Sequence, residues 1–261
     1  MLQVIENSIL KKYYRQYFRN IYRRINHSKN LSLDLSSKLI ILVYHRVLPA
    51  VAYDPSDMII SFKKFVAQVS ELSKKYPIIS LNEAVKQINE KVSHQDIQII
   101  LTFDDGYRDS YEIVFPYLCK KNIPATLFLS TDYIEKGNGC LSKDNFITWE
   151  QAREMNQKGM EMGSHGLSHH SLTQMAYARA VAEIRESKAL IEQNLGRQCH
   201  HFAFPFGSKN DFSNLLIEEV KKAGYQTCLL NIHGYNRLNS DSFCFRRIIM
   251  NEDVPIKYLL G

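Results

Sequence analysis

The feature that most constrains the fold is an alternation of short apolar runs with longer segments of helical periodicity. Seven runs rich in apolar and β-branched residues cover positions 39–44, 98–103, 125–130, 160–164, 200–204, 225–230 and 245–250. Helical spacing of apolar residues is clearest at 61–75, 109–121, 173–194 and 211–223. Strands that alternate with helices pair in parallel through right-handed crossovers. The pattern therefore predicts an α/β fold, a distorted (β/α) barrel of about seven parallel strands.

Length and composition agree with one large domain. The chain has 261 residues, which is enough for a single barrel with a substantial core. Its hydrophobic fraction of 45% and charged fraction of 23% are ordinary for a folded protein, and no apolar run has the length of a membrane span. We predict a helical arm at residues 1–30 and one catalytic domain at residues 31–261.

The net charge of +6 is confined to one end of the chain. Residues 1–30 hold seven of the 33 basic side chains but only one of the 27 acidic ones, so the rest of the chain is balanced. Because the body has no general basic character, we expect no nucleic-acid partner.

Apolar and basic residues in the arm fall on opposite faces of the predicted helix. The apolar face carries Ile9, Leu10, Tyr13, Tyr14, Tyr17, Phe18, Ile21, Tyr22 and Ile25. The basic face carries Lys11, Lys12, Arg15, Arg19, Arg23 and Arg24. Such a helix is suited to an anionic membrane surface, and we predict that residues 8–25 contact one. Docking of the helix on its own domain or on a partner protein is the alternative.

Cysteine usage and the first thirty residues bear on location. The five cysteines form no C-x-x-C pair and several lie in apolar runs, where a thiol behaves as a small hydrophobe; they are Cys119, Cys140, Cys199, Cys228 and Cys244. The arm lacks the continuous apolar stretch and cleavage site of a secretory signal. We therefore predict a cytoplasmic protein that is peripheral on the inner face of the membrane.

Polar residues with catalytic potential follow several of the predicted strands. Asp104 and Asp105 end the second apolar run, His165 ends the fourth, and Pro205-Phe206-Gly207 ends the fifth. In a parallel barrel the functional groups gather at the carboxyl ends of the strands. These side chains are therefore expected to meet at one mouth of the barrel.

Two adjacent carboxylates can take two different roles, because side chains on an extended backbone alternate in direction. Asp105 with His165 and His169 would give one carboxylate and two imidazoles, a set that leaves open positions for water and substrate on a metal ion. Asp104 would then accept a proton from the metal-bound water, which points to hydrolysis of an amide or an ester. His170 competes with His169 for the second imidazole position.

Each motif also has a simpler interpretation. Asp-Asp-Gly is common in turns and helix caps, and His-x-x-x-His is common on solvated helix faces. Their joint position at strand ends favours a divalent metal site, with Zn²⁺ as the first choice and cobalt, nickel, manganese or iron as alternatives. A non-haem iron oxygenase would use the same ligands, but it would give Asp104 no role.

The motifs resemble those of the polysaccharide deacetylase family, also called carbohydrate esterase family 4. The resemblance extends over about residues 39–250 and is strongest in Thr102-Phe-Asp-Asp-Gly106 and Ser164-His165-x-x-x-His169. Further support comes from Tyr44-His-Arg-Val47, Gly106-Tyr-Arg-Asp109, Thr148-Trp149 and Phe204-Pro-Phe-Gly207. The resemblance implies a distorted barrel of about seven strands and removal of N-acetyl groups from sugars.

The resemblance also implies roles for individual residues. Asp104 would be the general base, and the metal ligands would be Asp105, His165 and His169. The backbone N–H of Phe206 would help to hold the oxyanion. Phenylalanine in place of the frequent tyrosine leaves that backbone donor unchanged. Tyr107, Trp149 and Pro205 would belong to the substrate pocket.

The chain departs from the family pattern in two places. Many members carry an arginine two residues before the proline, where this chain has Ala203; we hypothesise that Arg246 or Arg247 takes over the task of steadying the catalytic aspartate. The general acid of the family is a histidine late in the chain. His233 is expected to fill that role. His45, at the end of the first predicted strand, is expected in the substrate pocket and is a less favoured candidate for the acid.

These observations together predict a metal-dependent carbohydrate N-deacetylase. Its substrate would be an N-acetylated sugar in a polysaccharide, an oligosaccharide or a lipid-linked glycan precursor. A catalytically silent sugar-binding protein of the same fold and an O-acetyl esterase are the alternatives.

Overall fold

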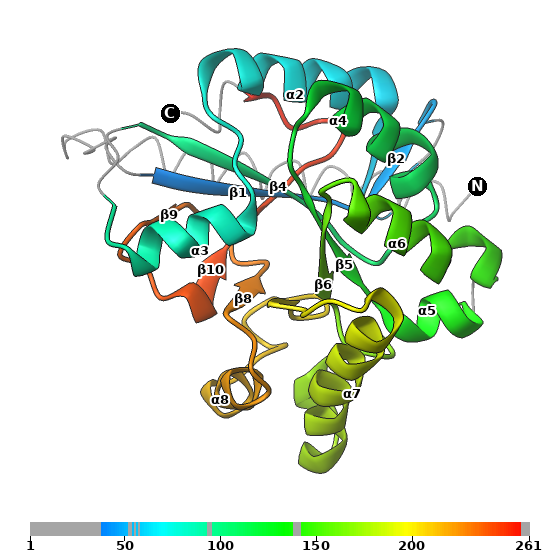
Figure 1. The fold of residues 1–261 in the computed structure, drawn as a ribbon, viewed down its shortest axis with the longest axis vertical. Helices are drawn as coiled ribbons and strands as arrows, with labels where there is room; N and C mark the ends of the chain where they lie inside the picture. Colours follow the sequence, from blue (N-terminus) through cyan, green and yellow to red (C-terminus); the bar gives the residue numbers. More distant parts are fainter. Residues whose placement is uncertain are drawn as a thin grey trace, which may run out of the picture.

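A mostly parallel sheet runs through the molecule and is surrounded by helices (Figure 1). The structure is a computed structural model that describes residues 38–51, 54, 56, 58–92, 96–137 and 142–256. The arm predicted at residues 1–30 lies outside this set. The principal strands are β1 (Lys38–Tyr44), β4 (Gln98–Phe103), β5 (Thr126–Leu129), β6 (Glu161–Ser164), β7 (His201–Ala203) and β8 (Thr227–Leu230).

The last strand brings the two ends of the sheet together. It consists of β10 (Phe245–Arg246) and β11 (Ile248–Ile249), which only Arg247 separates. The strand order is β10-β8-β7-β6-β5-β4-β1-β11, so this one segment pairs with β8 on one side and with β1 on the other. The sheet is thereby nearly closed, and the predicted (β/α) barrel is confirmed.

Asn236 pairs with the backbone at the point where the last strand passes from β8 to β1. It begins β9 (Asn236–Arg237), which pairs antiparallel with β1. Its side-chain oxygen accepts a hydrogen bond from the backbone N–H of Arg246 at 2.8 Å, and its amide nitrogen donates to the Arg246 carbonyl at 2.9 Å. The buried backbone groups at the closure are therefore paired, as burial requires.

Within the described residues, seven α-helices pack around the strands: α2 (Phe62–Lys75), α3 (Leu81–Asn89), α4 (Phe115–Lys121), α5 (Thr131–Lys136), α6 (Trp149–Gln157), α7 (Tyr177–Leu195) and α8 (Asn214–Lys222). The longer predicted helical segments correspond to α2, α4, α7 and α8. The apolar periodicity did not single out α3, α5 and α6, which are nine, six and nine residues long. Among the described residues no helix is both long enough and apolar enough to cross a membrane.

Short elements complete the fold. The strands β2 (Arg46–Leu48) and β3 (Ile59–Ser61) form a small parallel sheet of their own. A π-helical turn at Ser110–Val114 leads into α4, and 3₁₀ turns lie at Lys143–Asn145, Leu172–Gln174 and Ser242–Cys244.

The barrel interior is an apolar column that supports the mouth. Its members are Leu39, Ile41, Ile100, Phe128, Ala203, Leu229 and Phe245, with Leu81 and Ala84 of α3 packed against them. The Phe128 ring lies close to Gly163, where an added Cβ would come within 2.5 Å of ring atoms. Glycine is therefore needed at this point of β6. The Arg247 guanidinium carbon lies 5.7 Å from the centre of the Phe128 ring, so the column ends beneath a charged group.

Candidate metal centre

Asp104 and Asp105 follow β4 at the mouth of the barrel. Asp104 continues the strand pairing, since its N–H donates to the Tyr44 carbonyl at 3.0 Å. Asp105 leaves the strand in a left-handed conformation, with φ of 74°. Both side chains are buried. The regular alternation of a strand, which we had expected, would place the two side chains on opposite faces. The turn at Asp105 instead allows both carboxylates to approach the same nitrogen, His165 Nε2.

His165 comes from the end of β6 and faces both acids. Its Nδ1 donates to the Ala203 carbonyl at 2.8 Å, which leaves Nε2 as the nitrogen with a free lone pair. Nε2 lies 3.7 Å from Asp104 Oδ2 and 3.6 Å from Asp105 Oδ1. Burial lowers the pKa of His165 to about 4, so the imidazole is neutral at physiological pH, as a metal ligand must be.

His169 reaches the same carboxylate from the loop after β6. Its Nε2 lies 3.0 Å from Asp105 Oδ1, and its ring lies beside Tyr133 and Phe206, with ring centres 5.5 Å and 4.9 Å away. Burial acts to lower the pKa of His169, but the neighbouring Asp105 carboxylate raises it above the ordinary value. His170 is exposed and contacts the carbonyl and hydroxyl of Ser168 through Nδ1. The structure thus brings His169, and not His170, to Asp105.

The three side chains fit a divalent cation. Ligand atoms of Asp105, His165 and His169 all lie within 4.8 Å of one another. Asp105 Oδ1 is buried, and no described residue gives it a hydrogen bond of good geometry, although two imidazole nitrogens approach it. A buried carboxylate oxygen without a partner is costly, so this donor set calls for a positive ion between its members. One carboxylate and two imidazoles are typical of zinc.

Asp104 is held by a buried arginine. Arg247 donates from both terminal nitrogens, at 2.7 Å to Oδ1 and 2.8 Å to Oδ2, and both side chains are completely buried. Burial acts to raise the pKa of Asp104, but the Arg247 guanidinium, together with the nearby His165 and His45, outweighs it and holds the pKa below its usual range. Asp104 is therefore an ionised carboxylate in one fixed orientation. Arg246, the other arginine considered from the sequence, is exposed.

A cavity of about 220 Å³ opens beside these groups. Its lining includes His45, Phe206 and Asn231 together with the three candidate metal ligands. His45 is buried at the end of β1, and among the described residues its Nδ1 has no hydrogen-bond partner. His233 is half-buried in the loop after β8 and is not among the lining residues. The cavity thus contains a different histidine from the one expected as the acid.

The other predicted pocket residues, Tyr107, Trp149 and Pro205, are not among the residues that line the cavity. Tyr107 stacks on Phe146 with ring centres 5.1 Å apart. Trp149 begins α6, and its indole N–H donates to Glu135 at 2.5 Å. The carbonyl of Pro205 accepts a hydrogen bond from Gly207 inside the turn.

The Pro205-Phe206-Gly207 turn lies at the mouth, where Phe206 lines the cavity. Phe206 is 52% exposed and has φ of 60°. Asn231 fixes the turn, because its side chain donates to the Phe206 carbonyl at 2.8 Å and its N–H donates to the Gly207 carbonyl at 2.9 Å. Among the described residues no acceptor takes the Phe206 N–H. Sequence reasoning missed Asn231, although it directly follows β8 and the strand-end rule could have found it.

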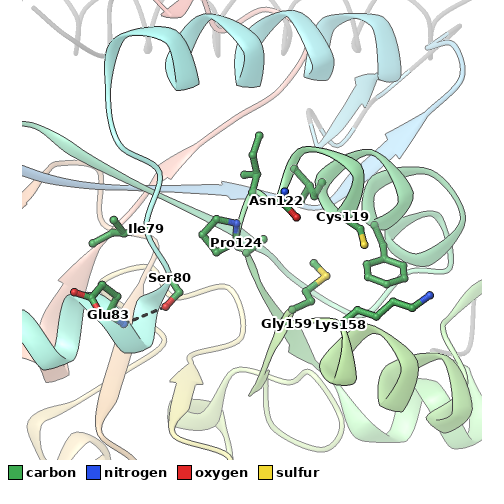
Figure 2. Close-up of a pocket in the computed structure, with 13 residues that line it drawn as sticks. Ile79, Ser80, Glu83, Cys119, Asn122, Pro124, Lys158 and Gly159 are labelled. Atoms are coloured by element: carbon green, nitrogen blue, oxygen red, sulfur yellow. Dashed lines mark hydrogen bonds between the residues drawn. The ribbon is translucent and has the colours of Figure 1, made fainter.

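A larger cavity, of about 470 Å³, lies at the opposite ends of the strands. Figure 2 shows its lining, which includes Ile79, Pro124 and Gly159 near the starts of β5 and β6. The hydrogen bond drawn there, from Glu83 N–H to Ser80 Oγ, caps the first turn of α3. None of the candidate metal ligands lines this cavity, so volume alone would have pointed to the wrong end of the barrel.

Sequence comparisons relate the chain to deacetylases. A family model described as polysaccharide deacetylase matches residues 91–228. YxkH of Bacillus subtilis is 28% identical over 191 residues, which cover 73% of this chain and 63% of that protein. The poly-beta-1,6-N-acetyl-D-glucosamine N-deacetylase of Staphylococcus epidermidis is 27% identical over 184 residues, covering 67% and 62%. The chain thus spans a little under two thirds of the length of these relatives.

Solved structures share the fold. The Streptococcus pyogenes deacetylase PplD, in complex with acetate, superposes with a TM-score of 0.74 at 22% identity, covering 86% of this chain and 97% of that one. IcaB from Ammonifex degensii gives a TM-score of 0.71 at 22% identity, covering 86% and 95%. These likenesses support the same barrel architecture.

Replacing Arg247 tests the buried ion pair. Arg247→Met should lower the free energy of unfolding by about 3–5 kcal/mol at pH 7, because Asp104 would remain buried and charged without a partner. Since folding lowers the pKa of Asp104, the pair stabilises the fold above the ordinary carboxyl pKa and loses this effect as the pH falls. The difference in unfolding free energy between the wild type and Arg247→Met should therefore become smaller as the pH falls. Urea unfolding without added metal measures this difference.

The neighbouring arginine supplies the control. Arg246→Met alters an exposed side chain and should change the unfolding free energy by less than about 0.5 kcal/mol. Equal losses in the two variants, or a loss that does not depend on pH, would contradict the importance of the Asp104–Arg247 pair.

Proposed function

The chain belongs to the polysaccharide deacetylase family, and from that membership we propose that it is a metal-dependent hydrolase that removes N-acetyl groups from an N-acetylated sugar. One observation carries the proposal: Asp105, His165 and His169 converge on one point, and a second carboxylate is fixed beside them by Arg247. The convergence supplies a metal centre, and the fixed carboxylate supplies a proton acceptor.

The proposed reaction is attack of water on the acetamide carbonyl. A divalent cation, most simply Zn²⁺, would polarise that carbonyl and lower the pKa of a bound water. Asp104 accepts the proton of the attacking water, since Arg247 holds it ionised and in a fixed orientation. The backbone N–H of Phe206, which makes no backbone hydrogen bond within the described residues, would donate to the oxygen that becomes negatively charged in the tetrahedral intermediate. Cleavage of the C–N bond then gives acetate and an amine, and the amine requires a proton.

Two histidines are candidates for that proton donor, and the geometry favours His45 over His233. His45 lines the cavity and its Nδ1 has no partner among the described residues. His233 would have to approach from outside the cavity lining. We therefore assign the general acid to His45, the residue that the sequence left as the alternative.

Acetate release is the direct test of the function. The purified protein should release acetate from N-acetylglucosamine oligomers, lose this activity on chelation and regain it with Zn²⁺. Asp104→Asn should lower kcat by about 100-fold to 10,000-fold, because it removes the base. An O-acetylated sugar measured in parallel separates amide from ester hydrolysis. Binding of the oligomers without acetate release would instead identify a silent sugar-binding protein.

The acid can be assigned with two matched variants. His45→Gln should lower kcat by about 100-fold or more while leaving metal affinity nearly unchanged, because general acid catalysis contributes on that scale. His233→Gln should change kcat by less than about threefold, within the range of a residue outside the reaction. The opposite pattern would return the acid role to His233. Thermal unfolding of both variants shows whether the buried His45 is also needed for folding.

We further propose that the substrate is a glycan carried at a membrane surface, in keeping with a cytoplasmic enzyme that is peripheral on the inner face. The support is the sequence of residues 8–25, which lie outside the described part of the chain. The helix predicted there would carry six cations on one face and aromatic residues on the other, a pattern that suits anionic head groups. A helix bound there would concentrate the enzyme near lipid-linked sugars.

Vesicle binding tests this part separately. The full chain should cosediment with vesicles containing phosphatidylglycerol, bind vesicles of phosphatidylcholine weakly, and dissociate as salt rises, because exposed charges are screened. Replacing Lys11, Lys12, Arg15 and Arg19 with glutamine should weaken binding but not acetate release from soluble oligomers. If vesicle binding depended neither on lipid charge nor on these four residues, the proposal of a membrane-surface substrate would fail, and the proposed hydrolase activity would be unaffected.

A further inference from the structure

The loop that carries His169 is fastened to a buried carboxylate on another element. Glu183 of α7 is fully buried beneath the loop. Its Oε2 accepts hydrogen bonds from the backbone N–H of Leu167 at 2.8 Å and of Ser168 at 2.9 Å. Its Oε1 accepts from the Ser168 hydroxyl at 2.8 Å and from the Arg179 guanidinium at 2.9 Å. One side chain thus receives four hydrogen bonds, three of them from the loop.

The opposite edge of the loop is held by the start of α5. Thr131 N–H donates to the Gly166 carbonyl at 3.3 Å, and Asp132 N–H donates to the Leu167 carbonyl at 2.9 Å. The loop therefore donates hydrogen bonds to Glu183 through its backbone N–H groups. Its carbonyls accept hydrogen bonds from the first N–H groups of α5, which have no partner within that helix. Neither set of groups can turn away without leaving a buried partner unpaired.

The loop needs this support because its backbone is strained. His169 has φ of 56°, a left-handed conformation that is costly for a residue with a side chain. Such conformations persist only where the surroundings impose them. The strained residue is also the one that brings Nε2 to within 3.0 Å of Asp105. Anchoring of Leu167 and Ser168 therefore acts on the position of His169.

We propose that Glu183 is a positioning residue of the metal centre: by accepting the Leu167 and Ser168 amides, it holds the backbone in the conformation that delivers His169 to Asp105. This inference rests on the proposed metal-dependent function. Glu183 does not itself touch the cation or the substrate. Its effect passes through the loop.

The chemistry of the anchor requires a carboxylate. All four groups that reach Glu183 are donors, and an ionised carboxylate offers only acceptors. Glutamine has nearly the same volume, but its NH₂ group must face one pair of these donors. Glu183→Gln therefore keeps the packing of α7 and disturbs the loop contacts selectively.

Zn²⁺ affinity, measured by competition with a chromophoric chelator, tests the proposal without substrate. Glu183→Gln should weaken Zn²⁺ binding by about 10-fold to 100-fold, the usual effect of losing a group that orients a metal ligand. Glu186→Gln is the matched control, because Glu186 is exposed on the same helix, and it should bind Zn²⁺ like the wild type. Wild-type affinity in Glu183→Gln would overturn the proposal.

A double-mutant cycle distinguishes positioning from a general effect on folding. In a His169→Ala background, Glu183→Gln should cause no further loss of Zn²⁺ affinity, since the ligand that Glu183 positions is already gone. An equal loss in both backgrounds would show that Glu183 acts elsewhere, and the proposal would fail. Thermal midpoints of the metal-free variants, measured alongside, show that all of them are folded.

A milder variant keeps the test decisive if Glu183→Gln does not fold. Ser168→Ala removes one loop contact to Glu183, and it should weaken Zn²⁺ binding by several-fold and accelerate hydrogen exchange at the Leu167 and Ser168 amides. No change in either quantity would contradict the anchoring role of Glu183.

If the wild type itself binds no Zn²⁺, both the proposed metal centre and the proposed role of Glu183 fail. If the wild type binds Zn²⁺ and releases acetate while Glu183→Gln does both equally well, only the role of Glu183 falls.

Discussion

The arrangement at the mouth depends on the buried ion pair between Asp104 and Arg247. It joins the end of β4 to the point where the last strand passes from β8 to β1, so it ties the first half of the barrel to its closure. A buried carboxylate is costly alone, and a buried guanidinium is equally so. Each residue therefore confines the other to one position. The closure of the fold and the orientation of the proposed base are consequences of the same contact.

Beneath the ion pair, packing of the core residues fixes the position of the groups at the mouth. The Phe128 ring can lie close to β6 only because Gly163 has no side chain, and Arg247 rests above that ring. On the other side of the candidate metal centre, the Ala203 carbonyl orients His165 and Glu183 accepts hydrogen bonds from the loop of His169. The candidate ligands are thus supported by strands and buried hydrogen bonds. The exposed Phe206 stands at the edge, where a substrate can reach it.

Prediction from the sequence was most successful where a residue's position along a strand decides its environment. Runs of apolar residues located the strands, and the residues just after them converge at the mouth, including Asp105 and His165. It was weaker where direction depends on a single turn. The approach of both Asp104 and Asp105 to His165 depends on the left-handed conformation of Asp105, and the last run, expected as one strand, breaks at Arg247. Neighbouring residues of a strand face opposite sides, so the choice between Arg246 and Arg247 required the register.

The sequence by itself determined the barrel class, the two acids and the histidine motif, because strand periodicity and residue chemistry are local properties. Only the tertiary structure decided which imidazole meets Asp105, which arginine meets Asp104, and that His45 rather than His233 borders the cavity. It also revealed Asn231 and Glu183, whose partners lie 25 and about 15 residues away along the chain. Such contacts depend on how separate elements dock, and docking is set by packing over the whole barrel rather than by any one segment.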